Sequence, residues 1–587
     1  MTIKDTLQQF DKLDKKRLDE HAVSSALRQL KPEDGHEIEF ELLSELMAFD
    51  FAEDYSHKET GWGTYFGPMM TWSNGDGTFT ESPSIQMVTP EMIDYWEARA
   101  NETQNPVLAS RYYGLVWDFK EKISGKKPSH ELCRKYISAL LLQVNEDYGL
   151  HQVYYFNRLR RALTLSIELN DKELTESSKQ AILKAERKYS EDTKPGLWGY
   201  SFDLLVGNKK VNLSGSEESE IIKELELKLQ RLTSTENEGK KIDPWAAESA
   251  AKKLATYYRK HKQEKEVRRV ILSIGAAFDA IMTEGSAMQV SGWYEHLRNL
   301  YLQFNLNEEA AQILLKLRET GPQVSAGLST ISHSFQIPQE KIDKYIKAMT
   351  SGSLEDVINR VATQFIPNKK QAKEQIFDLS KSSPLLYMIG HDLLDEKGRV
   401  VAKIGSLEDD IEGHIVRRVS ESMTFSSMLL RLTLDDAVKN LGLSTESVME
   451  FIAKSPIINV ERLPIIEKGV KAYFDQDYIV AIHLLIPQIE EAIRNLIEIS
   501  GGNVLRPKNG GYQLRTFDDL LRDEIIDNSL GEDLAIYYRI LFTDQRGWNL
   551  RNEVCHGIAS PNKFDVQTAD RLMHGLLTLG LLRMNEQ

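Results

Sequence analysis

Residues 477–498 read DYIVAIHLLIPQIEEAIRNLIE and decide what kind of fold this chain adopts. Apolar side chains recur along this stretch at three- and four-residue steps, the spacing that places them on one face of an α-helix. They are Ile479, Ile482, Leu485, Ile486, Ile489, Ile493 and Leu496. The pattern predicts a long amphipathic helix, which Pro487 can kink and which Gly501 and Gly502 end.

Further helices are expected after this one. The spacing predicts them at Phe517–Asp527, Asp533–Leu541 and Val566–Met584, after a polar, glycine-rich loop from Gly501 to Gly511. Four or so helices in about 120 residues can close as a small bundle. The C-terminal part of the chain is therefore predicted to be a helical bundle.

The helical spacing also extends upstream. Apolar residues recur at the same steps from Pro244 to Glu319, and residues 293–314 predict a helix, a short turn and a second helix. Paired helices are typical of a solenoid, and an irregular all-helical domain would show the same spacing. We expect an all-α fold, with a helical N-terminal region and a solenoid-like middle region ahead of the C-terminal bundle.

A chain of 587 residues is too long for one hydrophobic core. We expect a mainly helical N-terminal domain at 1–210 and a helical-repeat-like region at 211–335. A helical connecting region with a small hairpin around Gly398 is expected at 336–463, and the bundle domain at 464–587.

The N-terminal domain contains an aromatic, glycine-rich loop. It covers residues 61–77, with Trp62 and Trp72 near its ends and an Asn-Gly-Asp-Gly turn at 74–77. The sequence allows two interpretations of this loop. It can pack onto the surface, or it can present its aromatic side chains as a platform for a ligand.

Composition excludes several classes of protein. The formal net charge of −15 disfavours a protein coated in positive charge for nucleic acids, although a few arginines in a cleft suffice for one phosphate. No run of about 18 apolar residues and no apolar signal core is present, so neither a membrane span nor secretion is expected. Two cysteines, Cys133 and Cys555, provide no disulfide framework and no zinc set. A cytoplasmic protein is predicted.

No cofactor or metal is expected either. The chain has no phosphate-binding loop, no dinucleotide fingerprint and no histidine pair with metalloprotease spacing. His483 and His574 have no partner for chemistry nearby in the sequence, so core or surface roles are predicted for both.

Residues suited to chemistry gather near the C-terminus. Residues 547–557 read GWNLRNEVCHG. Arg551 is a forked cation that fits phosphate, and His556 can move protons near neutral pH. These residue types fit phosphodiester cleavage without a metal, in which a ribose 2′-hydroxyl attacks phosphorus, so the substrate would be RNA. Asn552 could orient the imidazole or the phosphate. The alternative is that the three residues cap a helix, pair with carboxylates and hold the bundle.

The spacing of this motif raises a geometric question. Arg551 and His556 are five positions apart, or about 140° around a straight helix, so they would not point at the same atom. Either the arginine sits at the helix start, where the backbone turns, or two copies of the helix face each other across a shared cleft. The second solution implies a homodimer with two-fold symmetry.

The neighbourhood of the motif resembles a known family. Arg551, Asn552, His556 and Gly557 match the R-N-x-x-x-H-G pattern of domain of unknown function 4209 in the HEPN superfamily. The resemblance covers roughly residues 465–585, including the lead-in at 541–550 and the helix at 484–494. It implies a dimeric, metal-independent endoribonuclease of bacterial defence or stress response, in which Arg551, Asn552 and His556 are catalytic. Other members of the superfamily are noncatalytic, which implies a scaffold that dimerises or binds partners.

Four further residues are secondary candidates. Glu490 and Arg494 share a face of the long helix and form either an exposed ion pair or, as the resemblance implies, a polar group that approaches the motif. Gly557 allows close backbone approach after the histidine. Arg546 could form a basic rim with three other cations, Arg506, Lys508 and Arg515, although residues 464–587 carry 13 Lys/Arg against 18 Asp/Glu. RNA would then bind in a narrow cleft or on the helical region upstream, which could also bind a protein partner.

Overall fold

The structure is a computed structural model that describes most of the chain. It covers residues 2–12, 18–32, 37–54, 62–74, 78–234, 242–329, 336–508 and 510–583, except for the side chain at position 73. Residues 1–316 and 317–587 form two compact units, and each is described by itself. The finer division into four domains stays a prediction.

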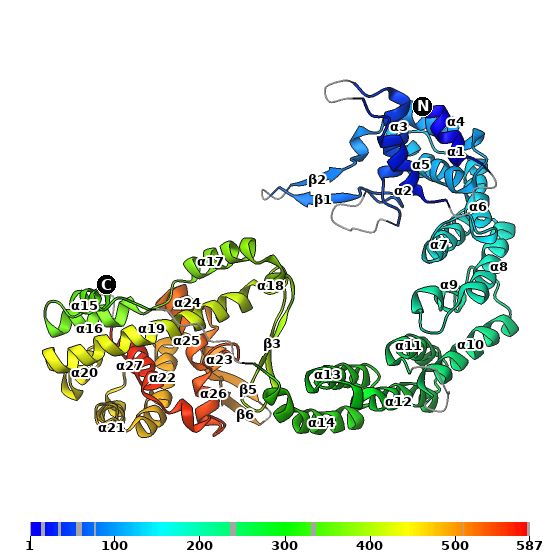
Figure 1. The fold of residues 1–587 in the computed structure, drawn as a ribbon. Helices are drawn as coiled ribbons and strands as arrows, with labels where there is room; N and C mark the ends of the chain where they lie inside the picture. The colour runs from blue at the N-terminus through cyan, green and yellow to red at the C-terminus, as the bar shows by residue number, and fades with distance from the viewer. Residues whose placement is uncertain are drawn as a thin grey trace. The chain divides into compact units, whose positions relative to one another are not determined.

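Helices dominate both units and confirm the all-α prediction. The described residues form twenty-seven α-helices, and their strands make three separate two-stranded antiparallel hairpins (Figure 1). None of the described helices is both long and apolar enough to cross a membrane.

In the first unit, helices pack mainly against their neighbours in sequence. The pairs α4 and α5, α5 and α6, α6 and α7, α7 and α8, α10 and α11, and α11 and α12 are in contact. Packing of successive helices is what a solenoid requires, and the solenoid itself stays a prediction. The elements are α1 (Ile3–Phe10), α2 (Glu20–Arg28), α3 (Phe40–Asp50), β1 (Met70–Ser73), β2 (Phe79–Ser82), α4 (Pro90–Glu102), α5 (Pro106–Ser124), α6 (His130–Asn145), α7 (Gln152–Glu168), α8 (Lys172–Tyr189), α9 (Tyr200–Leu205), α10 (Gly215–Thr233), α11 (Pro244–Lys260), α12 (Glu264–Ile281), α13 (Ala287–Gln303) and α14 (Asn307–Ala326), which continues into the second unit.

The aromatic loop of the first unit is packed at one end and exposed at the other. Phe66 is buried, and the Trp62 indole N–H donates a hydrogen bond to the Glu81 carboxylate at 2.9 Å. Trp72 lies on the β1–β2 hairpin and is 48% exposed. Gly61 and the predicted turn residues 75–77 lie outside the described part of the chain.

The second unit contains the residues for which a bundle was predicted. Its elements are α15 (Gln339–Met349), α16 (Leu354–Gln364), α17 (Lys369–Ser382), α18 (Pro384–Met388), β3 (His391–Leu394), β4 (Val400–Ile404), α19 (Ile411–Leu441), α20 (Thr445–Ile452), α21 (Leu463–Phe474), α22 (Tyr478–Ile499), β5 (Leu505–Lys508), β6 (Gly511–Leu514), α23 (Phe517–Leu521), α24 (Glu524–Leu530), α25 (Glu532–Phe542), α26 (Leu550–Cys555) and α27 (Val566–Leu579). The strands β3 and β4 form the hairpin predicted around Gly398, whose positive φ of 71° suits glycine.

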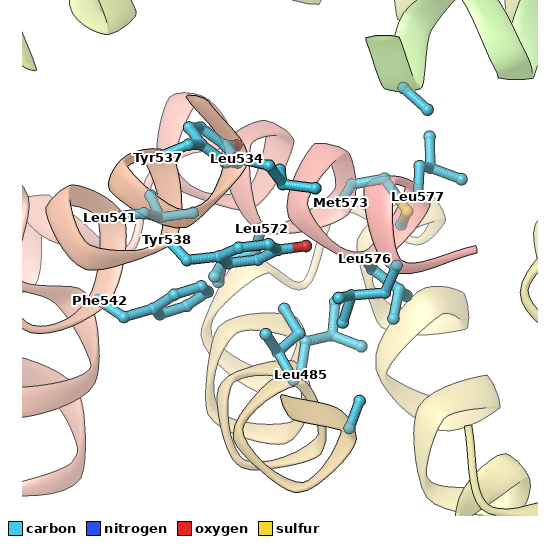
Figure 2. Packing of buried hydrophobic residues seen from close by; sticks show 14 of the residues in the cluster. Leu485, Leu534, Tyr537, Tyr538, Leu541, Phe542, Leu572, Met573, Leu576 and Leu577 are labelled. Carbon is cyan, nitrogen blue, oxygen red and sulfur yellow. The ribbon is translucent and has the colours of Figure 1, made fainter. Parts of the chain in front are cut away.

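One hydrophobic core extends through this unit. It includes residues of the predicted connecting region, such as Leu430 and Leu434 of α19, as well as residues of the predicted bundle. Aromatic and aliphatic side chains of α25 face α27 in this core, and Leu485 of α22 lies nearby (Figure 2). The burial of α22 and α27 in this core fixes the scaffold from which the motif projects.

The predicted apolar stripe of α22 is buried with one exception. Six of its seven residues are at most 7% exposed, whereas Ile479 is 59% exposed. Ile479 lies in the first turn of the helix, so the buried stripe begins one turn later than predicted. The helix continues through Pro487, which lies inside it.

Three other predictions for this unit were wrong in detail. The stretch 501–511 is not a continuous loop. It contains β5 and the first residue of β6, and the two strands pair as a hairpin. The helix predicted at Phe517–Asp527 is two helices, because the Asp523 carboxylate accepts a hydrogen bond from the backbone N–H of Ile525 and starts α24. The last helix ends at Leu579, before the predicted end at Met584, which lies outside the described residues.

Candidate functional site

The motif lies on α26, a helix of six residues that begins with a sharp turn. Gly547 passes so close to α25 that a Cβ there would lie 2.7 Å from the carbonyl oxygen of Ile540. Asn549 then adopts a left-handed conformation with φ of 52°, which asparagine tolerates better than most residues. Leu550 and Val554 are buried and attach the helix to the core. The sequence of the lead-in therefore sets the direction in which the motif projects.

Arg551 is the second residue of α26 and reaches across to α22. Its Nε donates a hydrogen bond to Glu490 Oε2 at 2.9 Å, and Nη2 lies 3.5 Å from Oε1. Arg494 Nη2 donates to the same Oε1 at 3.0 Å, one helical turn away. The structure thus brings Arg551 together with the two secondary candidates on α22, Glu490 and Arg494.

These side chains form a compact group of balanced charge. Arg494 also pairs with Glu491. Glu491 was not predicted as a site residue, although a carboxylate three residues before an arginine lies on the same helix face. The side chains of Glu490 and Arg494 are 13% and 14% exposed, so they are not the surface ion pair of the simpler interpretation. Arg551 is 24% exposed and remains the member most accessible to solvent among the three.

Asn552 faces back into the turn that starts the helix. Its Nδ2 donates to Asn549 Oδ1 at 2.8 Å and lies 3.3 Å from the carbonyl oxygen of Thr543. The His556 backbone N–H donates to the Asn552 carbonyl oxygen at 3.3 Å, but among the described residues no hydrogen bond joins the Asn552 side chain to the His556 imidazole. The contacts of Asn552 hold the turn that places Arg551.

His556 caps the C-terminal end of α26 and is exposed. Its backbone φ and ψ are −92° and 0°, and Gly557 follows in the left-handed region with φ of 67°. The His556 imidazole makes no hydrogen bond to any described residue. Because the helix has ended, the angle expected for one straight helix does not apply to it. The imidazole is free to meet a ligand from solvent.

Arg546 does not join the basic rim proposed from the sequence. Its guanidinium donates to both carboxylate oxygens of Asp544, at 3.0 and 2.9 Å, and lies 3.5 Å from Asp410. Burial alone would raise the pKa of Asp544, but its hydrogen bonds with Arg546 outweigh this and leave the pKa below the ordinary value. Arg546 therefore ties the lead-in of the motif to the start of α19. Asp410 is 136 positions away in sequence, so no local signal could have identified this contact.

Arg515, another residue of the proposed rim, is also occupied. It donates to the Asp523 carboxylate at 2.6 Å and to the carbonyl oxygens of Asn503 and Asp519 at 2.9 and 2.7 Å. Arg506 and Lys508 lie on strand β5 instead. The four cations thus do not gather around Arg551.

A second polar group is buried in the same unit on α27. Arg571 and His574 are fully buried; Arg571 donates to the Ser427 hydroxyl at 3.1 Å, and His574 Nδ1 lies 2.7 Å from the Tyr537 hydroxyl. Burial lowers the pKa of His574 well below its ordinary value. The core role predicted as one option for this histidine agrees with its position, whereas His483 is exposed and stacks on Phe564.

In the described residues, no group of three or more His, Cys, Asp or Glu side chains is arranged to hold a metal ion. Comparison of the chain with protein-family models, curated proteins and solved structures finds no match. The functional argument therefore depends on the motif and its contacts.

Proposed function

We propose that the protein is a metal-independent endoribonuclease of the HEPN type. The observation that carries this proposal is the exposed His556 imidazole, free of any hydrogen bond to a described residue, at the end of the short helix on which Glu490 holds Arg551. Arginine is suited to phosphoryl oxygens and histidine to proton transfer, and both requirements of RNA cleavage are then present in one segment.

The chemistry is an in-line displacement within the substrate. The ribose 2′-oxygen forms a bond to phosphorus while the bond from phosphorus to the leaving 5′-oxygen breaks, which yields a 2′,3′-cyclic phosphate and a free 5′-hydroxyl. His556 accepts the proton of the 2′-hydroxyl or donates one to the 5′-oxygen. Arg551 stabilises the negative charge that grows on the phosphoryl oxygens. Asn552 maintains the turn that positions the arginine.

A homodimer through the bundle completes this mechanism. Two imidazoles allow one His556 to accept the proton while its counterpart in the second copy donates the other. Ile558 lies two residues after His556 and is 69% exposed, an apolar side chain that a second copy would cover. Light scattering on the full chain tests this part, and a monomer at micromolar concentration would contradict it.

The family resemblance extends the proposal to biology. A cytoplasmic effector of bacterial defence or stress response is the role that we propose, with the helical first unit as a sensor or a binding surface for a protein partner. Slowed growth on overexpression, relieved by His556→Ala, is the expected sign of such an effector.

The decisive experiment measures RNA cleavage by the purified full chain with a chelator present. His556→Ala should lower the rate by about 100- to 10,000-fold, the range attributed to general acid–base catalysis. Arg551→Ala should also lose most activity. His483→Ala is the matched control, because His483 is another exposed histidine of the same unit and should leave the rate unchanged. Cleavage that persists in both motif variants would refute the assignment of the site.

One contact favours a second candidate function, a noncatalytic scaffold. Arg551 is already paired with Glu490. In a scaffold, the sole role of this ion pair is to attach α26 to α22. In that case the wild-type chain does not cleave RNA, and Arg551→Ala changes dimerisation or stability instead. Cleavage by the wild type distinguishes the two functions.

A further inference from the structure

The β5–β6 hairpin extends from the core as an exposed ribbon. Its described strand residues are exposed except for Gln513, which is half-buried; Asn509 lies outside the described residues. The base is firmly held, because the Arg515 backbone N–H donates to the Val504 carbonyl at 2.8 Å and the Arg515 side chain bonds to Asp523. A ribbon fixed at its base and open along its length is a candidate binding surface.

The register sorts the side chains of this ribbon onto two faces. Leu505 pairs with Leu514 and Pro507 with Tyr512, so these four residues share one face. Arg506 pairs with Gln513 on the opposite face, where Lys508 also lies. The apolar face is open to solvent: Leu505 is 41%, Leu514 49% and Tyr512 78% exposed.

Charge distinguishes this ribbon from its surroundings. Residues 505–514 contain no Asp or Glu and two cations, Arg506 and Lys508, although residues 464–587 carry 13 Lys/Arg against 18 Asp/Glu. Lys508 has no partner among the described residues, and Arg506 makes a 3.3 Å contact with Asp519 while its side chain stays 46% exposed. The ribbon is therefore a local positive feature that suits a polyanion.

The ribbon also follows the helix that pairs with the motif. Glu490, the partner of Arg551, lies nine residues before the end of α22, or about 14 Å along the helix axis. Strand β5 starts six residues after that helix end. The hairpin thus directly follows the helix whose Glu490 holds Arg551.

We infer that the β5–β6 hairpin binds single-stranded RNA, with a base stacked on Tyr512 on one face and phosphates paired with Arg506 and Lys508 on the other. Exposed aromatic rings and cations are the elements with which proteins bind single strands without strict sequence preference. Here the ring and the cations lie on opposite faces, so the strand crosses an edge of the two-stranded ribbon between them. A duplex is disfavoured because the major groove of A-form RNA is too narrow for side chains to read. The inference rests on the proposed ribonuclease function, to which it adds the surface that holds the substrate.

The size of the apolar face argues against a protein as its main occupant. Strands of four residues make a ribbon about 13 Å long, and its two strands lie about 5 Å apart. The area of such a face is far smaller than the roughly 800 Å² that each partner contributes to a stable protein interface. One exposed tyrosine ring, in contrast, is sufficient to stack a base.

The test measures RNA binding in the full chain with His556→Ala as background, so that the RNA stays intact. Fluorescence anisotropy with a labelled single-stranded RNA reports Kd. Tyr512→Ala should weaken binding by roughly 5- to 150-fold, the effect of losing one stacked base, whereas Tyr512→Phe keeps the ring and should stay within about twofold.

The cationic pair has its own measurement and control. The double variant Arg506→Ala/Lys508→Ala should lower the slope of log Kd against log salt by about 1.4, because each lost phosphate contact in a single strand removes about 0.7. Lys209→Ala/Lys210→Ala removes two exposed charges from the first unit and should leave the slope unchanged.

Two results would overturn the inference. In the first, every hairpin variant has the same RNA affinity and the same salt slope as the parent. If the wild type nevertheless cleaves RNA, only the ribonuclease proposal survives. The second result is a change in oligomeric state without a change in RNA affinity, which would make the hairpin a protein-docking surface. If the hairpin variants lose RNA binding but the wild type does not cleave, the inference stands and the ribonuclease proposal fails.

Discussion

Two arginine–histidine pairs lie in the same unit of this protein, and their surroundings are opposite. Arg571 and His574 on α27 are fully buried, whereas Arg551 is 24% exposed and His556 is exposed at the end of α26. The buried pair is part of the core, and its arginine bonds to α19. The exposed pair faces solvent next to a carboxylate of α22.

The difference shows that residue type alone does not make a chemical site. Burial lowers the pKa of His574 well below its ordinary value, so this imidazole stays neutral, and no substrate can reach it. His556 has access to solvent and no competing hydrogen bond from a described residue. The same two residue types therefore stabilise the fold in one place and are available for catalysis in the other.

Removing the two arginines should separate these roles most clearly. Arg571→Ala should lower the free energy of unfolding by about 3 to 5 kcal/mol, because it leaves a cavity and removes the bonds to α19. Arg551→Ala should cost about 1 kcal/mol, since its ion pair with Glu490 is partly solvated. Urea denaturation of both variants measures the difference. Equal losses would show that Arg551 is as much a structural residue as Arg571.

Asp570, the residue before Arg571, provides a second test of this comparison, because its protonation makes stability depend on pH. Asp570 is fully buried, accepts hydrogen bonds from the Tyr473 hydroxyl at 2.7 Å and from Arg431 at 3.1 Å, and burial raises its pKa to about 6. The folded state then binds a proton more tightly than the unfolded state. This contribution to stability is complete below the ordinary value of 3.8 and is lost as pH rises through 6.

The expected size of that effect is roughly 2.4 kcal/mol between pH 4 and pH 7, from the shift of 3.8 to about 6. The free energy of unfolding of the wild type minus that of Asp570→Asn should rise by this amount as pH falls. Asparagine has no carboxyl proton, so other titrating groups cancel in the difference. A flat difference across this range would show that Asp570 is not held in a desolvated site.

The sequence predicted the helices better than their limits. Six residues of the apolar stripe of α22 are buried because burial of one helix face follows directly from the spacing of apolar residues. The helix break before α24 and the β5–β6 hairpin were missed because short elements depend on a single cap or on strand pairing. Such local alternatives differ little in free energy, and tertiary contacts decide between them.

In the candidate site, too, local features were predicted and contacts between distant residues were not. Glu490 and Arg494 were expected to share a helix face, and the structure adds that Arg551 meets them from 61 positions away. The contact of Arg546 with Asp410 was beyond prediction because it joins distant parts of the chain. Periodicity reports which side of a helix is apolar, but not which helix comes to face it.

The smallest expected effect concerns the placement of Arg551. Glu490→Gln keeps the shape of the side chain but removes its charge, so Arg551 is held less firmly, which matters for the proposed ribonuclease. Cleavage should slow by about tenfold, equivalent to about 1.4 kcal/mol, mainly in kcat. Glu491→Gln is the matched control, because Glu491 pairs with Arg494 and makes no described contact with Arg551.

The two-residue comparison on α22 also tests the site against the scaffold interpretation. In an enzyme, Glu490→Gln and Arg551→Ala should affect kcat non-additively, because both act through the same guanidinium. In a scaffold, both should alter only unfolding, and Glu491→Gln should have an effect of similar size. A kcat that responds equally to Glu490→Gln and Glu491→Gln would contradict a specific positioning role for Glu490 and leave charge on α22 as the cause.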